Sequence, residues 1–245
     1  MRGRIIMILH IPHSSTATLD YKLNNKEQEM LRMTDHFTDD LYTCRDASRI
    51  VFGLSRLICD VERFEDDNEE SMSRFGMGVC YTKNTDGKKL RDVTEEDKNH
   101  LIENYYRPHH KKLTNEVDKE LKETGASLIV DCHSFPDKSY YFNSDFNQSR
   151  PDICIGTDEF HTPKILVEKV KCFFLSKGYN VQVNNPYSGS IVSLKHYKKN
   201  KNVSSIMIEI NRKLYMHEDG FKTEHYDDLK RELTELLIKI NKEIR

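Results

Sequence analysis

The sequence predicts an α/β fold with a mostly parallel sheet covered by helices on both faces. Short apolar runs alternate with longer segments of helical period. Several of these runs end in polar residues, as strands do at the ligand-binding edge of a parallel sheet. With 37% hydrophobic residues, 11 Phe and 12 Tyr, the 245 residues can bury the core of one large domain or two small ones.

The N-terminal part predicts two strands and a helix. Ile5–Ile11 is a continuous apolar run that stops at Pro12, and we interpret it as a buried strand because it is too short for a signal peptide. Lys26–Thr43 is polar with scattered apolar residues and is predicted to be a helix. Ile50–Val61 has the composition of a strand, although Gly53 interrupts it.

The middle of the chain predicts an excursion and then helices. Glu65–Arg91 is acidic, contains glycines and is expected to form a lid or excursion outside the core. Thr94, with Asp97 three residues later, predicts a helix start. We expect this helix to end near Arg107, because Pro108 disfavours helical geometry in its predecessor.

A second helix is expected from Pro108 to Gly125, because apolar residues recur there at every fourth position. Short apolar runs at Ser127–Asp131 and Ile153–Gly156 predict strands.

In the C-terminal part, Thr162 and Pro163 predict the start of a helix that ends at Gly178. Tyr179–Val183 and Ser204–Ile210 are predicted strands. The last helix carries one apolar face, formed by Tyr226, Leu229, Leu233, Leu236, Leu237 and Ile240.

Charge and cysteine usage exclude several functional classes. Lys+Arg 38 against Asp+Glu 40 gives a net charge of −2, so no overall field favours nucleic acid or a membrane surface. The basic run Lys195–Lys201 is expected to be a solvated loop. None of the six cysteines forms a C-x-x-C pair, which favours reduced thiols in a cytoplasmic protein. A small-molecule partner is the expectation that remains.

Chemically active residues lie at or near the ends of four of the predicted strands. His13 and His133 each follow an apolar run, Arg56 and Asp60 lie near the end of the second, and Glu209 lies within IMIEI. Two histidines and a carboxylate are the usual protein ligands of a catalytic zinc, and a further Glu is its usual general base. A single histidine at a strand end is usually structural, but a buried Glu without a partner would be costly and so requires a role.

An ordered set of motifs resembles the N-formylglutamate amidohydrolase family. The motifs span residues 11 to 216 and read IPHSS, TDHFTDDLY, SRLICDVERF, YYRPHHKKL, IVDCHSF, NNPYSG and IEINRKLYM. More distantly, the chain resembles the zinc carboxypeptidases and aspartoacylases.

The resemblance implies a three-layer α/β/α fold of phosphorylase/hydrolase-like type, with a mixed sheet, in a single catalytic domain over residues 1–245. It also implies one zinc ion per chain, held by His13, His133 and an acid. Asp35 is the first candidate for that acid and Glu62 the second, because the H-x-x-E pattern of the carboxypeptidases fails at Thr16.

The substrate-binding tetrad departs from the family pattern. Relatives usually read D-L-N-R where this chain reads Asp60-Val61-Glu62-Arg63. Arg63 can still clamp a substrate carboxylate through two parallel hydrogen bonds. Glu62 would repel that carboxylate, which raises the alternative of a different N-acyl amino acid or a short peptide.

Each of the remaining candidate site residues also has a purely structural interpretation. Arg56 is a candidate for polarising the scissile carbonyl, and its alternative is a salt bridge to Asp60. The other predicted substrate-binding residues, each with a structural alternative such as helix packing, a turn or an ion pair, are His110, Asn185, Tyr187, Gly189 and Arg212.

The sequence therefore predicts zinc-assisted hydrolysis of a linear amide with Glu209 as the general base. Two rivals are a metallopeptidase or amidase acting on short or cell-wall peptides, and a non-catalytic amino-acid-binding module.

Overall fold

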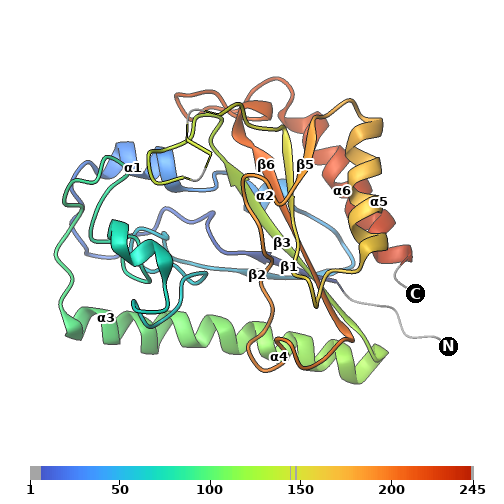
Figure 1. Ribbon diagram of the computed structural model, residues 1–245, viewed down its shortest axis with the longest axis horizontal. Coiled ribbons are helices and arrows are strands. Elements are labelled where there is room, and N and C mark those ends of the chain that lie inside the picture. Colours follow the sequence, from blue (N-terminus) through green and yellow to red (C-terminus); the bar gives the residue numbers. More distant parts are fainter. Residues whose placement is uncertain (1–6, 144, 147, 244–245) are drawn as a thin grey trace.

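A six-stranded mixed sheet forms the centre of the computed structural model, which describes residues 7–143, 145–146 and 148–243. The strand order is β2-β1-β3-β6-β4-β5 (Figure 1). Strands β2, β1, β3 and β6 run parallel, and β4 pairs antiparallel with β6 and parallel with β5. The strands are β1 (Met7–Ile11), β2 (Ala47–Val51), β3 (Ser127–Phe135), β4 (Ile153–Gly156), β5 (Val181–Val183) and β6 (Val203–Asn211).

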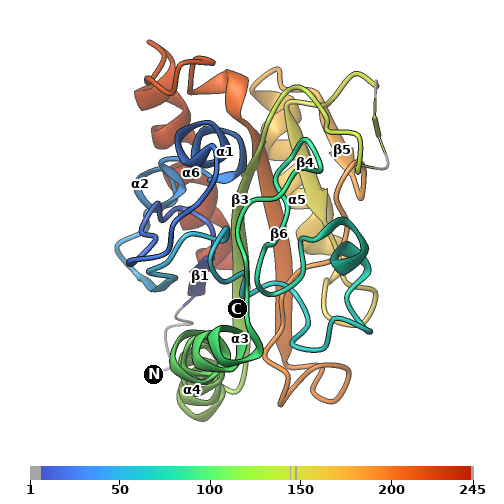
Figure 2. The same cartoon turned by 90° about the vertical axis from the view of Figure 1, so that its left-hand side faces the viewer.

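Strands β3 and β6 form the central pair and lie side by side in Figure 2. Each has nine residues, and all nine residues of β3 are buried. Each contains a short apolar run, residues 128–130 in β3 and 206–208 in β6, as is typical of strands covered on both faces. Their register places His133 beside Glu209.

Helices cover both faces of the sheet and complete the predicted three layers. Helices α5 and α6 share an apolar core with β1, β3, β4 and β6 on one face, whereas α4 packs against the other face. In Figure 1 the long helix α4 runs below the sheet and α5 and α6 lie at the right. The α-helices are α1 (Lys26–Met33), α2 (Thr38–Leu41), α3 (Glu95–Leu101), α4 (Arg107–Thr124), α5 (Lys164–Ser176) and α6 (Tyr226–Glu243).

Helix α3 continues into α4 where the sequence predicted an end near Arg107. A π-helical turn, Ile102–Tyr106, joins them, and Pro108 lies in the first turn of α4, where a proline is tolerated. The start of α3 follows the prediction. Thr94 Oγ1 accepts a hydrogen bond from the Asp97 amide at 3.0 Å, and the Asp97 carboxylate accepts one from the Thr94 amide at 3.1 Å.

Two predicted elements are wrong in extent. The single helix expected over Lys26–Thr43 is two helices, because Thr34 is extended and Phe37 has a φ of 65°. The Asp35 amide instead donates to the backbone oxygen of His13 at 3.0 Å. This break is what brings Asp35 to the end of β1.

The strand expected over Ile50–Val61 is also wrong, since β2 ends at Val51. Beyond it the chain forms turns that share a separate apolar cluster with the π-helical turn Ile102–Tyr106, and Ile58, Cys59 and Val61 are buried in this cluster. The strand-like composition of this segment reflects burial in that cluster, outside the sheet.

The segment over 65–91 lies outside the sheet, as expected, and contains the 3₁₀ turn Ser71–Phe75. That it acts as a lid stays a prediction. All six cysteines are free, and all except Cys172 are buried. Among the described residues, no helix combines the length and the apolar character that crossing a bilayer requires.

Candidate active site

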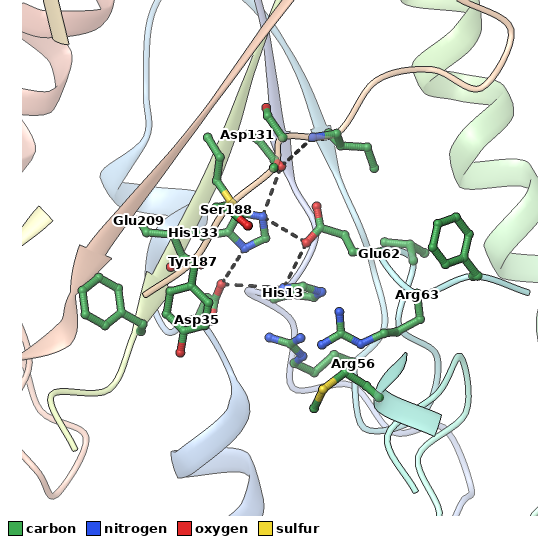
Figure 3. Close-up of a pocket in the computed structure, with 18 of the residues that line it drawn as sticks. His13, Asp35, Arg56, Glu62, Arg63, Asp131, His133, Tyr187, Ser188 and Glu209 are labelled. Atoms are coloured by element: carbon green, nitrogen blue, oxygen red, sulfur yellow. Dashed lines mark hydrogen bonds and ion pairs between the residues drawn. The ribbon is translucent and has the colours of Figure 1, made fainter. Parts of the chain in front are cut away.

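A cavity of about 1090 Å³ opens at the carboxyl ends of β1, β3 and β6. His13 follows β1, His133 lies near the end of β3, and Glu209 is its partner in register on β6. Asp35 and Glu62 reach the same place from loops (Figure 3). The predicted convergence of chemically active residues at one edge of the sheet is what the structure shows.

His13 presents a free nitrogen to this cavity. Its Nε2 is 2.8 Å from Asp60 Oδ1, so the imidazole N–H donates a hydrogen bond to that carboxylate. Its Nδ1 has no hydrogen-bond partner among the described residues, although the side chain is only 2% exposed, and it lies 3.7 Å from Asp35 Oδ2. A buried nitrogen without a partner is costly unless another ligand satisfies it.

His133 and Asp35 complete the group. His133 Nδ1 lies 3.1 Å from Asp35 Oδ2, while its Nε2 lies 3.1 Å from Asp131 Oδ1. The other Asp35 oxygen accepts a hydrogen bond from Arg212 Nη2 at 3.0 Å. Asp35 Oδ2 therefore lies between the Nδ1 atoms of two histidines, each of which has a carboxylate behind its Nε2.

This set fits a metal ion. Ligand atoms of His13, Asp35 and His133 all lie within 4.8 Å of one another. Two imidazoles and one carboxylate are the protein ligands of a catalytic zinc, and carboxylates that hold the far ring nitrogens are their usual support. The unpartnered Nδ1 of His13 is the observation in this structure that favours an ion at this point.

A second group with potential ligands lies beside the first and comprises His10, Glu62 and Asp131. Its His10 Nδ1 and Asp131 Oδ1 are hydrogen-bonded to each other at 2.8 Å, whereas the first group contains His13 Nδ1, which has no hydrogen-bond partner among the described residues. The first group is therefore the better metal site.

The buried charges of the site shift the pKa values of its ionisable side chains. Burial disfavours the ionised form of Asp35, yet the nearby imidazoles of His13 and His133 hold its pKa well below the usual range. Burial likewise opposes a charge on His133, but the carboxylates of Glu62 and Asp131 raise its pKa well above the ordinary value. The buried acids thus create an environment that favours positive charge between the two rings.

Glu209 behaves differently from its acidic neighbours. It is 7% exposed, and its Oε2 has no hydrogen-bond partner within the part of the chain that the structure describes. Burial raises its pKa to about 7, and the charges of Asp35 and Glu62 add to that effect. A carboxylate with this pKa and a free oxygen beside a cavity suits a general base.

Arg56 and Arg63 share one buried acid. Arg56 Nη2 is 2.9 Å from Asp60 Oδ2, so the salt bridge considered as its alternative is present. Arg56 also lines the cavity. Arg63 Nε lies 3.8 Å from Asp60 Oδ2 and makes no hydrogen bond. Figure 3 shows the two guanidinium groups side by side below His13.

Glu62 turns toward the histidines. Its Oε2 is 3.1 Å from His133 Nε2 and 3.9 Å from His13 Nδ1, and its Oε1 is 3.7 Å from His10 Nδ1. The acid is therefore engaged with imidazoles near the candidate metal position.

The remaining predicted residues divide by position. His110, Tyr187, Gly189 and Arg212 line the cavity. His110 Nε2 is 2.9 Å from the Val61 backbone oxygen, so the imidazole donates to it. Asn185 is exposed outside the cavity lining and hydrogen-bonds to Gln182.

The sequence predicts no role for Asp131 or His10, and it indicates Asp60 only as a salt-bridge partner of Arg56. One signal was available for Asp131: it precedes His133 by two residues, and alternate residues of a strand share a face. Asp60 could not be placed behind His13 from the sequence, because a loop brings it there.

The sequence profile of the N-formylglutamate amidohydrolase family matches residues 5–216. Two curated proteins described as N-formylglutamate deformylase are similar. The Pseudomonas putida protein is 23% identical over 228 residues, which cover 89% of this chain and 84% of that protein. The Pseudomonas aeruginosa protein is 23% identical over 231 residues, with coverage of 89% and 85%.

Solved structures share the fold. The crystal structure of N-formylglutamate amidohydrolase from Ralstonia eutropha JMP134 has a TM-score of 0.84 and 24% identity, covering 98% of this chain and 94% of that one. A gene product from Agrobacterium tumefaciens has a TM-score of 0.62 and 17% identity, with coverage of 98% and 92%.

Proposed function

Because the chain belongs to the N-formylglutamate amidohydrolase family, we propose that it is a zinc-dependent hydrolase of N-acyl amino acids, with N-formylglutamate as the first candidate substrate. The observation that carries the proposal is the unpartnered Nδ1 of buried His13, which faces the same Asp35 oxygen as His133 Nδ1. His13, Asp35 and His133 would hold the metal. When bound, zinc supplies Lewis acidity that polarises a carbonyl and acidifies water.

Glu209 moves the proton. Its free Oε2 accepts a proton from the attacking water as the carbon–oxygen bond forms. It then delivers that proton to the nitrogen of the leaving amine as the carbon–nitrogen bond breaks. Its raised pKa keeps the affinity for the proton high enough for both steps.

The two arginines bind and stabilise negative charge. Arg56 is held against Asp60 by two of its nitrogens, so its guanidinium is fixed at the cavity wall and can stabilise the oxyanion without reorganising. Arg63, whose Nε lacks a hydrogen bond, has a free donor for a substrate carboxylate.

A larger N-acyl amino acid or a short peptide is the second candidate substrate. The cavity of about 1090 Å³ is of the size that encloses drug-sized ligands. One part of its wall is largely apolar, with side chains from Met33, Met72, Tyr140 and Phe142. A formyl group alone would leave that wall without contacts.

Elemental analysis of the purified protein, followed by a hydrolysis screen, tests the proposal. We expect about one zinc per chain and release of amine from N-formylglutamate, from longer N-acylglutamates or from dipeptides. The matched control is His133→Ala, which should lose both metal and hydrolysis. A protein that binds these compounds without metal and without turnover would be the non-catalytic binding module, and the proposed function would be wrong.

A further inference from the structure

A network of buried polar residues extends from the candidate metal site to α4. It links His109 of α4, His10 of β1, Asp131 of β3 and the candidate ligand His133. All four side chains are at most 4% exposed. The catalytic scheme above uses only His133.

Asp131 lies at the centre of this hydrogen-bonded network. Its Oδ1 accepts a hydrogen bond from His10 Nδ1 at 2.8 Å and from His133 Nε2 at 3.1 Å. Its Oδ2 accepts a hydrogen bond from the backbone amide of Ile191 at 3.1 Å. Figure 3 shows Asp131 above the ring of His133 and directed at its nitrogen. Three donors thus fix both oxygens of one carboxylate.

The contacts of Asp131 with His133 and with the Ile191 amide have different consequences. A proton on His133 Nε2, held by Asp131, leaves Nδ1 as the nitrogen that carries a free electron pair, and Nδ1 is the atom that faces Asp35. The Ile191 amide belongs to the segment 188–192, all of whose residues line the cavity. One carboxylate therefore connects the metal ligand to a wall of the substrate site.

His10 holds Asp131 in this orientation. The two residues are neighbours in the register of β1 and β3, so their side chains lie on one face of the sheet. His10 Nε2 is in turn 2.8 Å from His109 Nε2, and the His109 ring packs edge-on against Phe52 with ring centroids 5.1 Å apart. With both nitrogens engaged, His10 cannot rotate without breaking a buried hydrogen bond.

We propose that Asp131, held by His10 and His109, is a positioning residue that sets the orientation of His133 and the place of segment 188–192 together. The inference rests on the proposed function in that it takes His133 as a metal ligand.

Two variants of His10 and one control test it. His10→Leu removes the donor to Asp131, whereas the Nδ2–H of Asn in His10→Asn can replace Nδ1–H. The control is His161→Leu, which removes another buried histidine hydrogen-bonded through both nitrogens, to Val203 O and Lys198 N, at the opposite end of β6. All three variants are first compared for thermal stability, since removing a buried histidine lowers it in any structural role.

The decisive readouts are zinc release to a chromogenic chelator and amide hydrogen exchange at Ile191 in metal-free protein. We expect His10→Leu to lose zinc affinity by roughly 10- to 100-fold, the usual effect of removing a residue that supports a metal ligand, and to exchange faster at Ile191. His10→Asn should restore both values towards wild type, and His161→Leu should change neither.

Unchanged zinc release and Ile191 exchange in His10→Leu would overturn the proposal, as would equal effects in His161→Leu. A wild-type protein with two zinc ions, one of which is lost in His10→Leu, would also overturn it and show that His10, Glu62 and Asp131 bind metal themselves. If the wild type binds no zinc, the proposed function fails, and Ile191 exchange alone decides whether His10 positions Asp131.

Discussion

At the scale of single residues, substitution of Glu209 is the most specific test of the proposed mechanism. Glu209→Gln preserves shape and hydrogen bonding but cannot accept a proton, so we expect kcat to fall by roughly 10²- to 10⁴-fold. Zinc content and melting temperature should stay close to the wild-type values. Retention of more than about a tenth of wild-type kcat would contradict the assignment, because this loss is smaller than that expected for a missing general base.

The raised pKa of Glu209 also predicts how the activity depends on pH. A base must be deprotonated to act, so kcat/KM should fall on the acidic side of the pKa of Glu209, which burial raises to about 7. A bound dication would lower that pKa, so the midpoint of the acidic limb should lie at or below pH 7. The limb should be absent from the residual activity of Glu209→Gln.

Asp35 and Glu62 are the two acids between which the sequence could not decide. Asp35 Oδ2 lies near the Nδ1 atoms of both histidines, whereas Glu62 approaches His133 through Nε2. Asp35→Asn should therefore lower zinc content strongly, while Glu62→Gln should keep about one zinc per chain and change the kinetic constants. Metal analysis after dialysis measures the difference, and the opposite ranking would make Glu62 the ligand.

At the scale of secondary structure elements, the junction of α4 and β3 holds a buried acid distant from the chemistry. Glu120 is fully buried, and its Oε2 accepts hydrogen bonds from the Ser127 hydroxyl at 2.6 Å and the Leu128 amide at 3.3 Å. Its Oε1 has no hydrogen-bond partner in residues 7–143, 145–146 and 148–243, and burial raises the pKa of Glu120 from 4.5 to about 8. The folded state therefore keeps a proton that the unfolded chain loses near pH 4.5.

The sign of the resulting pH dependence follows from linkage. Because the folded state binds more protons between pH 4.5 and 8, this group makes the folded protein less stable as pH rises through that range. Glu120→Gln removes this contribution, so its melting temperature relative to wild type should rise between pH 6 and pH 9. Glu123→Gln, at an exposed position on the same helix, is the control. Parallel curves for Glu120→Gln and wild type would contradict the prediction.

The elements also show what pattern alone could predict. Apolar period located the long helices and central strands, because burial on both faces of the sheet requires those patterns. It failed at Thr34–Phe37, where a hydrogen bond to His13 outweighs the helical tendency of the flanking residues. It also failed over 52–61, because an apolar cluster outside the sheet requires the same residue types as a strand.

At the scale of the whole molecule, the site assembles from segments far apart in the chain. His13 and His133 were predictable because each follows an apolar run that had to be a strand. The orientation of Glu62 and the places of Asp60 and Asp131 behind the histidines were not, since they depend on loop paths and side-chain rotamers. Sequence patterns thus predicted the groups that face the cavity better than the residues that support them.

This assembly predicts that metal stabilises the fold. The candidate ligands lie after β1, between α1 and α2, and in β3, so an ion would join three segments that are separate in the unfolded chain. A ligand that binds only the folded state adds about 2.7 kcal/mol at a hundredfold excess over its Kd, or roughly 5–10 °C in Tm for a domain of this size. Chelator-treated protein should therefore melt at a lower temperature and recover on titration with zinc.

Variants of the candidate ligands test whether the stabilising zinc binds at this site. His13→Ala and Asp35→Asn should melt at the same temperature with and without zinc, because each loses one of three candidate ligands. Glu120→Gln should respond to zinc as the wild type does, since Glu120 lies at the other end of β3. Scanning calorimetry at fixed pH measures all four proteins. An equal rise in every one would place the zinc elsewhere, and no rise in the wild type would remove the metal from this site.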